Sequence, residues 1–361
     1  ILAEKWQHRT RGICVLSHTN AARHEIESRL GNTAAGQRLL AYPHFIGTIH
    51  AFVDEFLAIP WLRSRGYPVV MVDTAICERR RWQRLDRKWR YALEQKRMDE
   101  SSVRIVDAGF KVAKKNGEFP FADNTETYRN VQRACRETTR EGYQCYDDMF
   151  IWARDLMGNV PTVVTALRDR FPLLFVDEAQ DNSEAQSAIL HDMFTAGDQP
   201  VMCQRFGDPN QAIFNFVGDE GATTRPFPDD MVKKDLPNSH RFGQKIADLA
   251  DPLGIIPYKL VGQGPKEPLA SGKPEAVHTV FLFGDDSAQN VLDAYADLLI
   301  DTFSEQELLG GSFVAVGQIH RPPEAEQNDK HPRHVGHYWP NYDSELSKID
   351  PKPQSFVQYV I

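Results

Sequence analysis

The chain has 361 residues, of which 41% are apolar and 25% are charged, and its formal net charge is −8. This length suits two domains, or one core with a large insertion, and the composition excludes wholesale disorder. The acidic balance excludes binding to polyanions through bulk charge, so contact with nucleic acid requires a local basic surface. No apolar run approaches about 18 residues and no signal peptide opens the chain, so we expect a cytoplasmic protein without a membrane span.

The cysteines and histidines do not show the spacing of a metal-binding site. The five cysteines include no C-x-x-C pair, which predicts reduced core residues and argues against a disulfide framework and a zinc site; they are Cys14, Cys77, Cys135, Cys145 and Cys203. Near the C-terminus, His331, His334 and His337 lie three residues apart, with His320 upstream. A metal site needs converging ligands, so we favour an irregular loop there.

Two strand-to-helix steps open the chain. An apolar run over residues 12–16 leads through a polar turn to residues 21–30, where apolar side chains recur every four positions. A second extended stretch passes into a helical pattern after Thr48. Short strands that alternate with helices predict a parallel α/β core.

From about residue 62 to residue 144 the sequence mixes aromatic and charged residues at helical spacing, which predicts a mostly helical insertion. Residues 78–97 hold nine Arg or Lys against three Asp or Glu, with Trp82, Trp89 and Tyr91 between them. Two interpretations stay open. This stretch is either a solvated amphipathic helix with its aromatic residues in the core, or a surface that faces nucleic acid.

The α/β pattern resumes at residues 173–181, LLFVDEAQD. The apolar run predicts a buried parallel strand, and open α/β sheets bind ligands just beyond the carboxyl ends of such strands. Asp177 and Glu178 stand at that position. One carboxylate there suits Mg²⁺, usually held through water, and the other suits orientation or deprotonation of a water that attacks a nucleotide.

A further apolar run ends in GDPNQAIFNF, residues 207–216. Its Gly-Asp turn at a strand end places the Gln211 amide near a phosphate. Phe214 and Phe216 are two residues apart, so they share one face of an extended segment. They either stack on bases, at roughly 1–3 kcal/mol each, or belong to the core.

A second α/β unit begins near Leu236. Strands are predicted over residues 277–286 and 312–321, and an amphipathic helix is predicted over residues 289–303 between them. Two strands that flank a helix are typical of the start of a second domain.

Taken in order, these segments resemble the UvrD/Rep-like superfamily 1 DNA helicases. The resemblance covers roughly residues 1–321, and the insertion matches only in position and character. Seven segments carry it: SHTNAA (17–22), GTIHAF (47–52), CYDDMFIWARDL (145–156), VDEAQD (176–181), GDPNQAIFNF (207–216), LPNSHRF (236–242) and FVAVGQIHR (313–321).

The resemblance implies ATP and Mg²⁺ as cofactors and a role for each matching residue. Asp177 would bind Mg²⁺, Glu178 would act as the base toward water, and Gln180 would link its motif to neighbouring nucleotide-site motifs. Gln211 would sense the γ-phosphate, and Arg241 would reach the nucleotide from the second domain as an arginine finger. The residues implied in binding single-stranded DNA are Thr19, Asn20, Thr48 and His50, mainly toward the backbone, and Phe214 and Phe216 toward the bases. Without the resemblance, His50 reads as an ordinary, partly buried histidine.

Several family features are missing or altered. No G-x-x-x-x-G-K-[ST] phosphate loop occurs, and the C-terminal motifs V and VI are absent. We therefore expect an N-terminally incomplete chain that cannot turn over ATP alone. His18 replaces a common aromatic residue, Pro209 interrupts its motif, and Val217 replaces a usual basic residue.

The resemblance implies an α/β, RecA-like fold divided into a first RecA-like domain, a mostly helical insertion, part of a second RecA-like domain, and a further insertion or irregular tail. We expect the first RecA-like domain at 1–55 and 145–235 and the helical insertion at 56–144. The part of the second RecA-like domain is expected at 236–321, and the further insertion or tail at 322–361. The implied function is ATP-dependent 3′–5′ movement on single-stranded DNA and its junctions with duplex, within a repair or phage-defence complex if a protein partner exists.

Two other function classes remain in view. A non-catalytic DNA-binding or scaffold subunit would keep the fold without the phosphate loop. A metal-dependent nuclease using Asp177, Glu178 and Asp181 is disfavoured, because one strand end supplies all the acids and Gln211 and Arg241 would have no role.

Overall fold

The computed structural model describes residues 5–6, 8–115, 117–212, 229–264, 279–317 and 334–342. The chain divides into two compact units, Ile1–Asp235 and Leu236–Ile361. Among the described residues, no helix has both the length and the apolar character needed to cross a bilayer.

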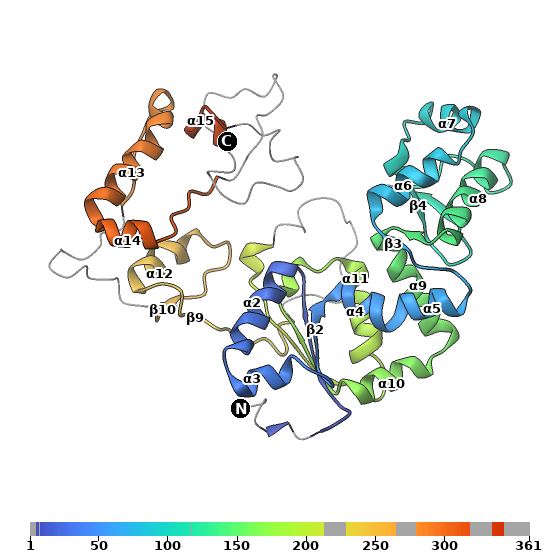
Figure 1. Ribbon diagram of the computed structural model, residues 1–361, viewed down its shortest axis with the longest axis horizontal. Coiled ribbons are helices and arrows are strands. Elements are labelled where there is room, and N and C mark those ends of the chain that lie inside the picture. Colours follow the sequence, from blue (N-terminus) through green and yellow to red (C-terminus); the bar gives the residue numbers. More distant parts are fainter. Residues whose placement is uncertain are drawn as a thin grey trace. The chain divides into compact units, whose positions relative to one another are not determined.

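A four-stranded parallel sheet forms the centre of the first unit (Figure 1). Its strands lie in the order β2 (Phe45–Thr48), β1 (Ile13–Ser17), β7 (Leu173–Val176) and β8 (Met202–Arg205). Cys14 lies opposite Phe45 on one side and Leu174 on the other, and both Cys14 and Leu174 are fully buried. A parallel sheet buries both faces of its inner strands under helices, so the predicted parallel α/β core is confirmed.

Helices follow the strands and begin at residues whose hydroxyl groups cap them. Thr19 caps α2 (Asn20–Gly31), Thr48 caps α4 (Ile49–Val53), and Ser183 caps α11 (Glu184–Leu190), each by accepting a backbone N–H of the first turn. Such a cap contributes about 1 kcal/mol. The remaining helical segments of the sheet domain are α3 (Ala34–Leu39), η1 (Asp54–Ala58), α5 (Ile59–Ser64), α9 (Tyr146–Asn159), α10 (Thr162–Arg170) and η4 (His191–Thr195), of which η1 and η4 are π-helical.

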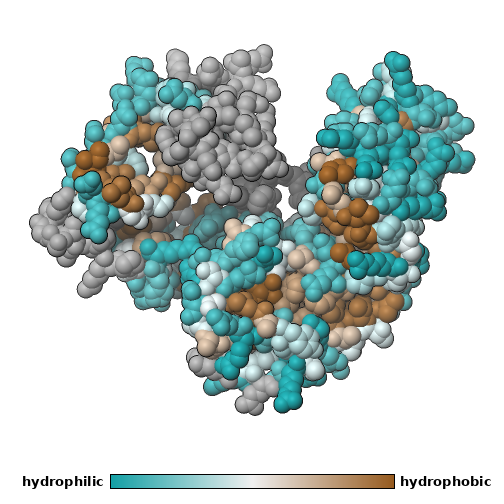
Figure 2. Space-filling view, in the orientation of Figure 1, coloured by the Kyte–Doolittle hydropathy of each residue, from teal (hydrophilic) through white to brown (hydrophobic). Residues whose placement is uncertain are grey.

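The insertion is mostly helical, as its sequence predicts, and adds two small sheets. Figure 1 shows its helices gathered beyond α9, and Figure 2 shows mainly hydrophilic residues on this part of the surface. Strand β3 pairs with β6 in parallel, and β4 pairs with β5 in antiparallel orientation. The elements are β3 (Met71–Val72), α6 (Thr74–Gln83), α7 (Arg87–Glu94), η2 (Glu100–Ser102), β4 (Val103–Ile105), β5 (Val112–Lys114), α8 (Glu126–Arg140) and β6 (Tyr143–Gln144).

The amphipathic-helix interpretation of residues 78–97 is wrong as one continuous helix, because the chain breaks between α6 and α7. Leu85 turns into the core with 3% of its surface exposed, and Asp86 precedes the new helix in an extended conformation. The aromatic residues also divide: Trp82 and Trp89 pack on the core, whereas Tyr91 is 61% exposed. Burial of Leu85 therefore overrides the continuous helical spacing.

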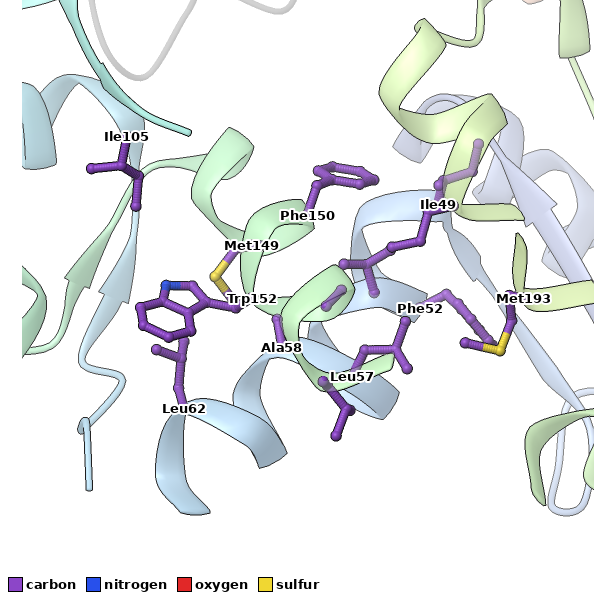
Figure 3. Close-up of a cluster of buried hydrophobic side chains, with 14 of the residues drawn as sticks. Ile49, Phe52, Leu57, Ala58, Leu62, Ile105, Met149, Phe150, Trp152 and Met193 are labelled. Atoms are coloured by element: carbon purple, nitrogen blue, oxygen red, sulfur yellow. The ribbon is translucent and has the colours of Figure 1, made fainter. Parts of the chain in front are cut away.

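One hydrophobic cluster joins the sheet to the insertion. Figure 3 shows Phe52 and Leu62, from the helical run that follows β2, grouped with Met149 and Trp152 of α9. Ile105 of the insertion belongs to the same cluster. Because a close-packed core resists relative motion of its parts, α9 fixes the insertion to the sheet domain.

An ion pair lies inside this interface. Arg81 Nη2 donates to Asp148 Oδ2 at 2.5 Å, and the two side chains are 4% and 3% exposed. The same carboxylate oxygen accepts the Cys145 N–H at 2.8 Å. Ligand atoms of Cys77, Cys145 and Asp148 lie within 4.8 Å of one another, but the Arg81 cation already neutralises this carboxylate. The predicted placement of the cysteines in the core is confirmed for all but Cys203, which is half-buried.

The second unit contains short elements. Strand β9 (Asn238–Ser239) pairs in parallel with β10 (Val261–Gly262), and the predicted helix over 289–303 is confirmed as α13 (Val291–Thr302). The other helical segments are α12 (Gln244–Ala250), η6 (Asp251–Leu253), η7 (Asp285–Asn290), α14 (Glu305–Gly310) and α15 (Val335–Tyr338).

The two strands predicted around α13 are wrong in their described parts, 279–284 and 312–317, which form no strand. A parallel strand needs hydrogen-bonded neighbours and cover on its faces. Leu282 and Val316 are each 92% exposed, and β9 and β10 form a ladder of just two residues. Apolar residues alone do not form a strand where no partner edge is provided.

Candidate functional site

The parallel sheet gathers the candidate residues of the first unit at one edge. Its four strands run in the same direction, so the segments that follow them leave from the same side. These segments contain Thr19 and Asn20 after β1, Thr48 and His50 after β2, Asp177, Glu178 and Gln180 after β7, and Gln211 after β8. The carboxyl edge of a parallel sheet is the usual ligand-binding position in open α/β folds.

The acidic pair stands where β7 ends. The Asp177 N–H donates to Leu16 O at 2.8 Å, which continues the pairing of β1 and β7 by one residue. Glu178 then adopts a left-handed conformation with φ 52°, and a short helical turn, η3 (Ala179–Asp181), follows. A non-glycine residue in this conformation costs roughly 1–2 kcal/mol, and such strain concentrates at functional positions.

Gln180 ties the loop after β7 to the loop after β8. Its side chain is buried, and its Nε2 donates to Glu178 Oε2 at 2.7 Å. Its Oε1 accepts the Asp208 N–H at 3.1 Å. A backbone bond from Ala179 N to Phe206 O, 2.8 Å long, holds the same two loops together. The carboxylate of Glu178 is therefore positioned by a buried amide.

The loop after β8 presents Gln211. Asp208 precedes a short helical turn, η5 (Pro209–Gln211), and its Oδ1 accepts the Asn210 N–H at 2.9 Å. Its Oδ2 accepts from Gln211 Nε2 at 3.0 Å. The sequence pattern shows the Gly-Asp turn but not this contact of the Asp208 side chain with Gln211, although aspartate is a common turn residue.

The acids at this edge fit a magnesium ion. Asp177, Glu178 and Asp181 offer carboxylate oxygens, which are the hard ligands that Mg²⁺ prefers. No donor among the described residues reaches Asp181 Oδ1, although this atom is buried. A cation held directly or through water would satisfy it.

The starts of two helices face the same edge. Thr19 Oγ1 accepts the Ala22 N–H at 3.2 Å, and Thr48 Oγ1 accepts the Ala51 N–H at 3.1 Å. Each hydroxyl acts as an acceptor in its cap and keeps a proton to donate. Helix N-termini carry partial positive charge, so α2 and α4 favour an anionic ligand here.

His50 packs among aromatic rings. Its ring meets Phe150 edge-on at 4.9 Å between centroids and Tyr146 at 5.7 Å. Burial lowers the pKa of His50, the charge of Asp147 opposes this shift, and His18 adds to it. A neutral imidazole at the end of β2 offers hydrogen bonds without a positive charge.

Three predicted site residues do not belong to the described part of the first unit. Arg241 is exposed in the second unit, and its N–H donates to Ser239 Oγ at 3.3 Å. Phe214 and Phe216 lie outside the described residues, as do His320 and His331 of the C-terminal histidine group. The irregular loop favoured for this group is wrong for its other two histidines: His334 caps the short helix α15 and His337 lies in it, with 3.9 Å between their ring centroids.

A half-buried carboxylic acid lies one helical turn beyond His50. Asp54 opens the π-helical segment η1, and no donor among the described residues reaches its Oδ1. Burial raises the pKa of Asp54 from 3.8 to about 6. Sequence spacing does not show this residue, because its burial depends on packing of η1 against α9.

Asp54 makes the stability of the chain depend on pH. Between the unfolded pKa and the folded pKa, the folded state holds a proton that the unfolded chain has lost, so stability falls as pH rises through this window. The substitution Asp54→Asn removes the buried charge. We expect it to raise the free energy of unfolding by about 1–2 kcal/mol near neutral pH. Below about pH 4, where Asp54 is protonated in both states, we expect no measurable change.

Urea unfolding at the two pH values measures this effect, and Glu55→Gln provides the matched control because Glu55 is the exposed neighbour on the same helical segment. An equal change at both pH values would contradict the account of Asp54.

A parallel, helix-flanked sheet with acidic residues directly after an inner strand is consistent with a RecA-like α/β domain. A family model described as the UvrD/REP helicase N-terminal domain matches residues 1–230, which is more than half of the chain. The chain therefore belongs to the UvrD/REP helicase family. The family resemblance found in the sequence is confirmed.

The chain is also similar to the RecBCD enzyme subunit RecB of Chlamydia trachomatis serovar D, with 28% identity over 88 residues. The aligned stretch is 24% of this chain and spans 8% of the length of that relative.

Proposed function

We propose that this chain is the core of an ATP-driven motor that moves 3′ to 5′ along single-stranded DNA. The observation that carries the proposal is the shared sheet edge. The hydrogen bonds around Glu178 and the capped starts of α2 and α4 follow strands that end on the same side of one sheet. Hydrolysis at one part of this edge can then change contacts at the other. Membership of the UvrD/REP helicase family supports the same conclusion.

At the nucleotide, the residues have separate tasks. Asp177 would hold Mg²⁺, which when bound neutralises phosphate charge. Glu178 would accept the proton of the attacking water, and Gln211 would contact the terminal phosphate. Arg241, from the second unit, would stabilise the charge that develops on the transferred phosphoryl group.

At the DNA, Thr19, Asn20 and Thr48 would contact the backbone. Their position at helix starts supports this role, because N–H groups and the helix dipole favour phosphate. His50 would add a neutral hydrogen-bonding group, and Phe214 with Phe216 would stack on bases. The domain plan goes with this proposal: a first RecA-like domain (1–55 and 145–235), a helical insertion (56–144), part of a second RecA-like domain (236–321) and a further insertion (322–361).

Residues 1–361 contain no phosphate-loop motif, so we infer that this chain alone does not turn over ATP. We expect it still to bind DNA through the residues named above. The missing motif also favours the second candidate, a non-catalytic DNA-binding subunit. The similarity to a subunit of the RecBCD enzyme supports a protein partner.

A displacement assay tests the direction of movement. Protein expressed from the complete reading frame is given ATP and single-stranded DNA with biotin and streptavidin at one end. Streptavidin should leave a 5′ end much faster than a 3′ end, because a 3′–5′ motor runs toward the 5′ end. Faster release from the 3′ end would overturn the direction, and no ATP-dependent release from either end would support the non-catalytic subunit.

A further inference from the structure

Four residues at the sheet edge are linked by hydrogen bonds, with the backbone N–H of Asp208 as one of the donors. Glu178 Oε2 accepts from Gln180 Nε2 at 2.7 Å, Gln180 Oε1 accepts the Asp208 N–H at 3.1 Å, and Asp208 Oδ2 accepts from Gln211 Nε2 at 3.0 Å. The chain connects the loop after β7 with the loop after β8. Gln180 is 4% exposed, so its amide nitrogen and oxygen are held by protein partners and not by water.

The chemistry of each group fixes the orientation of both amides. A carboxylate accepts hydrogen bonds and donates none, so Nε2 and not Oε1 of Gln180 must face Glu178. The same holds for Gln211 beside Asp208. Gln211 Oε1 is consequently directed away from Asp208, while Nε2 keeps a second N–H for another partner.

We propose that Asp208 is a positioning residue for ATP hydrolysis, which sets the amide of Gln211 so that its oxygen accepts from the attacking water and its free N–H meets a phosphate oxygen. This inference rests on the proposed function. Asp208 has two oxygens with two tasks: Oδ1 caps the turn at Asn210, and Oδ2 orients Gln211. The backbone N–H of the same residue bonds to Gln180, which in turn donates to Glu178, so Asp208 contacts both amides.

Two substitutions separate these tasks. Asp208→Asn and Asp208→Ser each keep one oxygen that can cap the turn and lose the second carboxylate oxygen. In Asp208→Asn, an N–H then faces Gln211, which favours the reversed amide. We expect either variant, made in the protein of the complete reading frame, to lower kcat for ATP about 10- to 100-fold, with KM for ATP and affinity for single-stranded DNA changed less than about 2-fold.

A double substitution distinguishes positioning from a general structural effect. If Asp208 acts through Gln211, adding Asp208→Asn to Gln211→Ala should cost nothing beyond Gln211→Ala alone. Asp99→Asn is the matched control, because Asp99 caps the short turn η2 in the same way, far along the chain in the insertion. It should leave kcat unchanged.

The outcomes are separable. Wild-type protein that hydrolyses ATP with single-stranded DNA, together with normal kcat in both Asp208 variants, would overturn the role of Asp208 and leave the proposed function standing. Additive losses in the double variant would overturn it as well, since Asp208 would then act independently of Gln211. Wild-type protein that hydrolyses no ATP would remove both proposals together.

Discussion

Glu178→Gln, in the protein expressed from the complete reading frame, is expected to lower the rate of ATP hydrolysis by about 100- to 10 000-fold, the range of a lost general base. The substituted amide keeps the size of the side chain, and its oxygen can still accept from Gln180 Nε2 as the carboxylate does. The loop and its hydrogen bonds should therefore survive, and only the proton acceptor disappears. Steady-state hydrolysis with single-stranded DNA measures the loss.

Binding measurements complete this test. Affinity for single-stranded DNA and for ATP should stay within about 3-fold of wild type, because neither requires a proton acceptor. Glu184→Gln makes the same chemical change in the first turn of α11 and should leave the rate unchanged. Hydrolysis at a wild-type rate in Glu178→Gln would remove the assignment of Glu178 as the base.

Arg81→Met is expected to lower the free energy of unfolding of this chain by about 3–5 kcal/mol, because it leaves Asp148 as an unpaired charge in the core. Asp148 would keep only the Cys145 N–H as a donor at the same oxygen. The pair lies between α6 and α9, so its loss should loosen the insertion from the sheet domain. Urea unfolding, followed by tryptophan fluorescence, measures the change.

Two further variants show whether the charge or the size of the side chain matters. Arg79→Met removes an exposed arginine of the same helix and should change stability by less than about 0.5 kcal/mol. The double variant Arg81→Met with Asp148→Leu removes both charges and should be more stable than Arg81→Met alone. If Arg81→Met behaved like Arg79→Met, the buried pair would contribute nothing to the fold.

The parts of the fold that depend on local pattern were predictable from the sequence. Strands β1 and β7 are short apolar runs followed by polar turns, and the helices α2 and α13 show regular apolar spacing. The direction of the strands then places the residues after them at one edge, so most of the candidate site follows from pattern and chain order alone.

The remaining features depend on residues far apart in the sequence. Arg81 and Asp148 are separated by 67 positions, and no local pattern predicts that their charges meet in the core. The hydrogen bond between Gln180 and Asp208 joins residues 28 positions apart. The apolar residues at 279–284 and 312–317 fit a strand locally, yet neither segment forms one.

The most direct measurement is ATP hydrolysis, with and without single-stranded DNA, by protein of the complete reading frame beside the 361-residue chain. The proposed motor predicts hydrolysis that DNA stimulates in the longer protein, and none in the shorter one. A longer protein that folds and binds single-stranded DNA, yet hydrolyses no ATP in either condition, would contradict the motor and support a non-catalytic subunit.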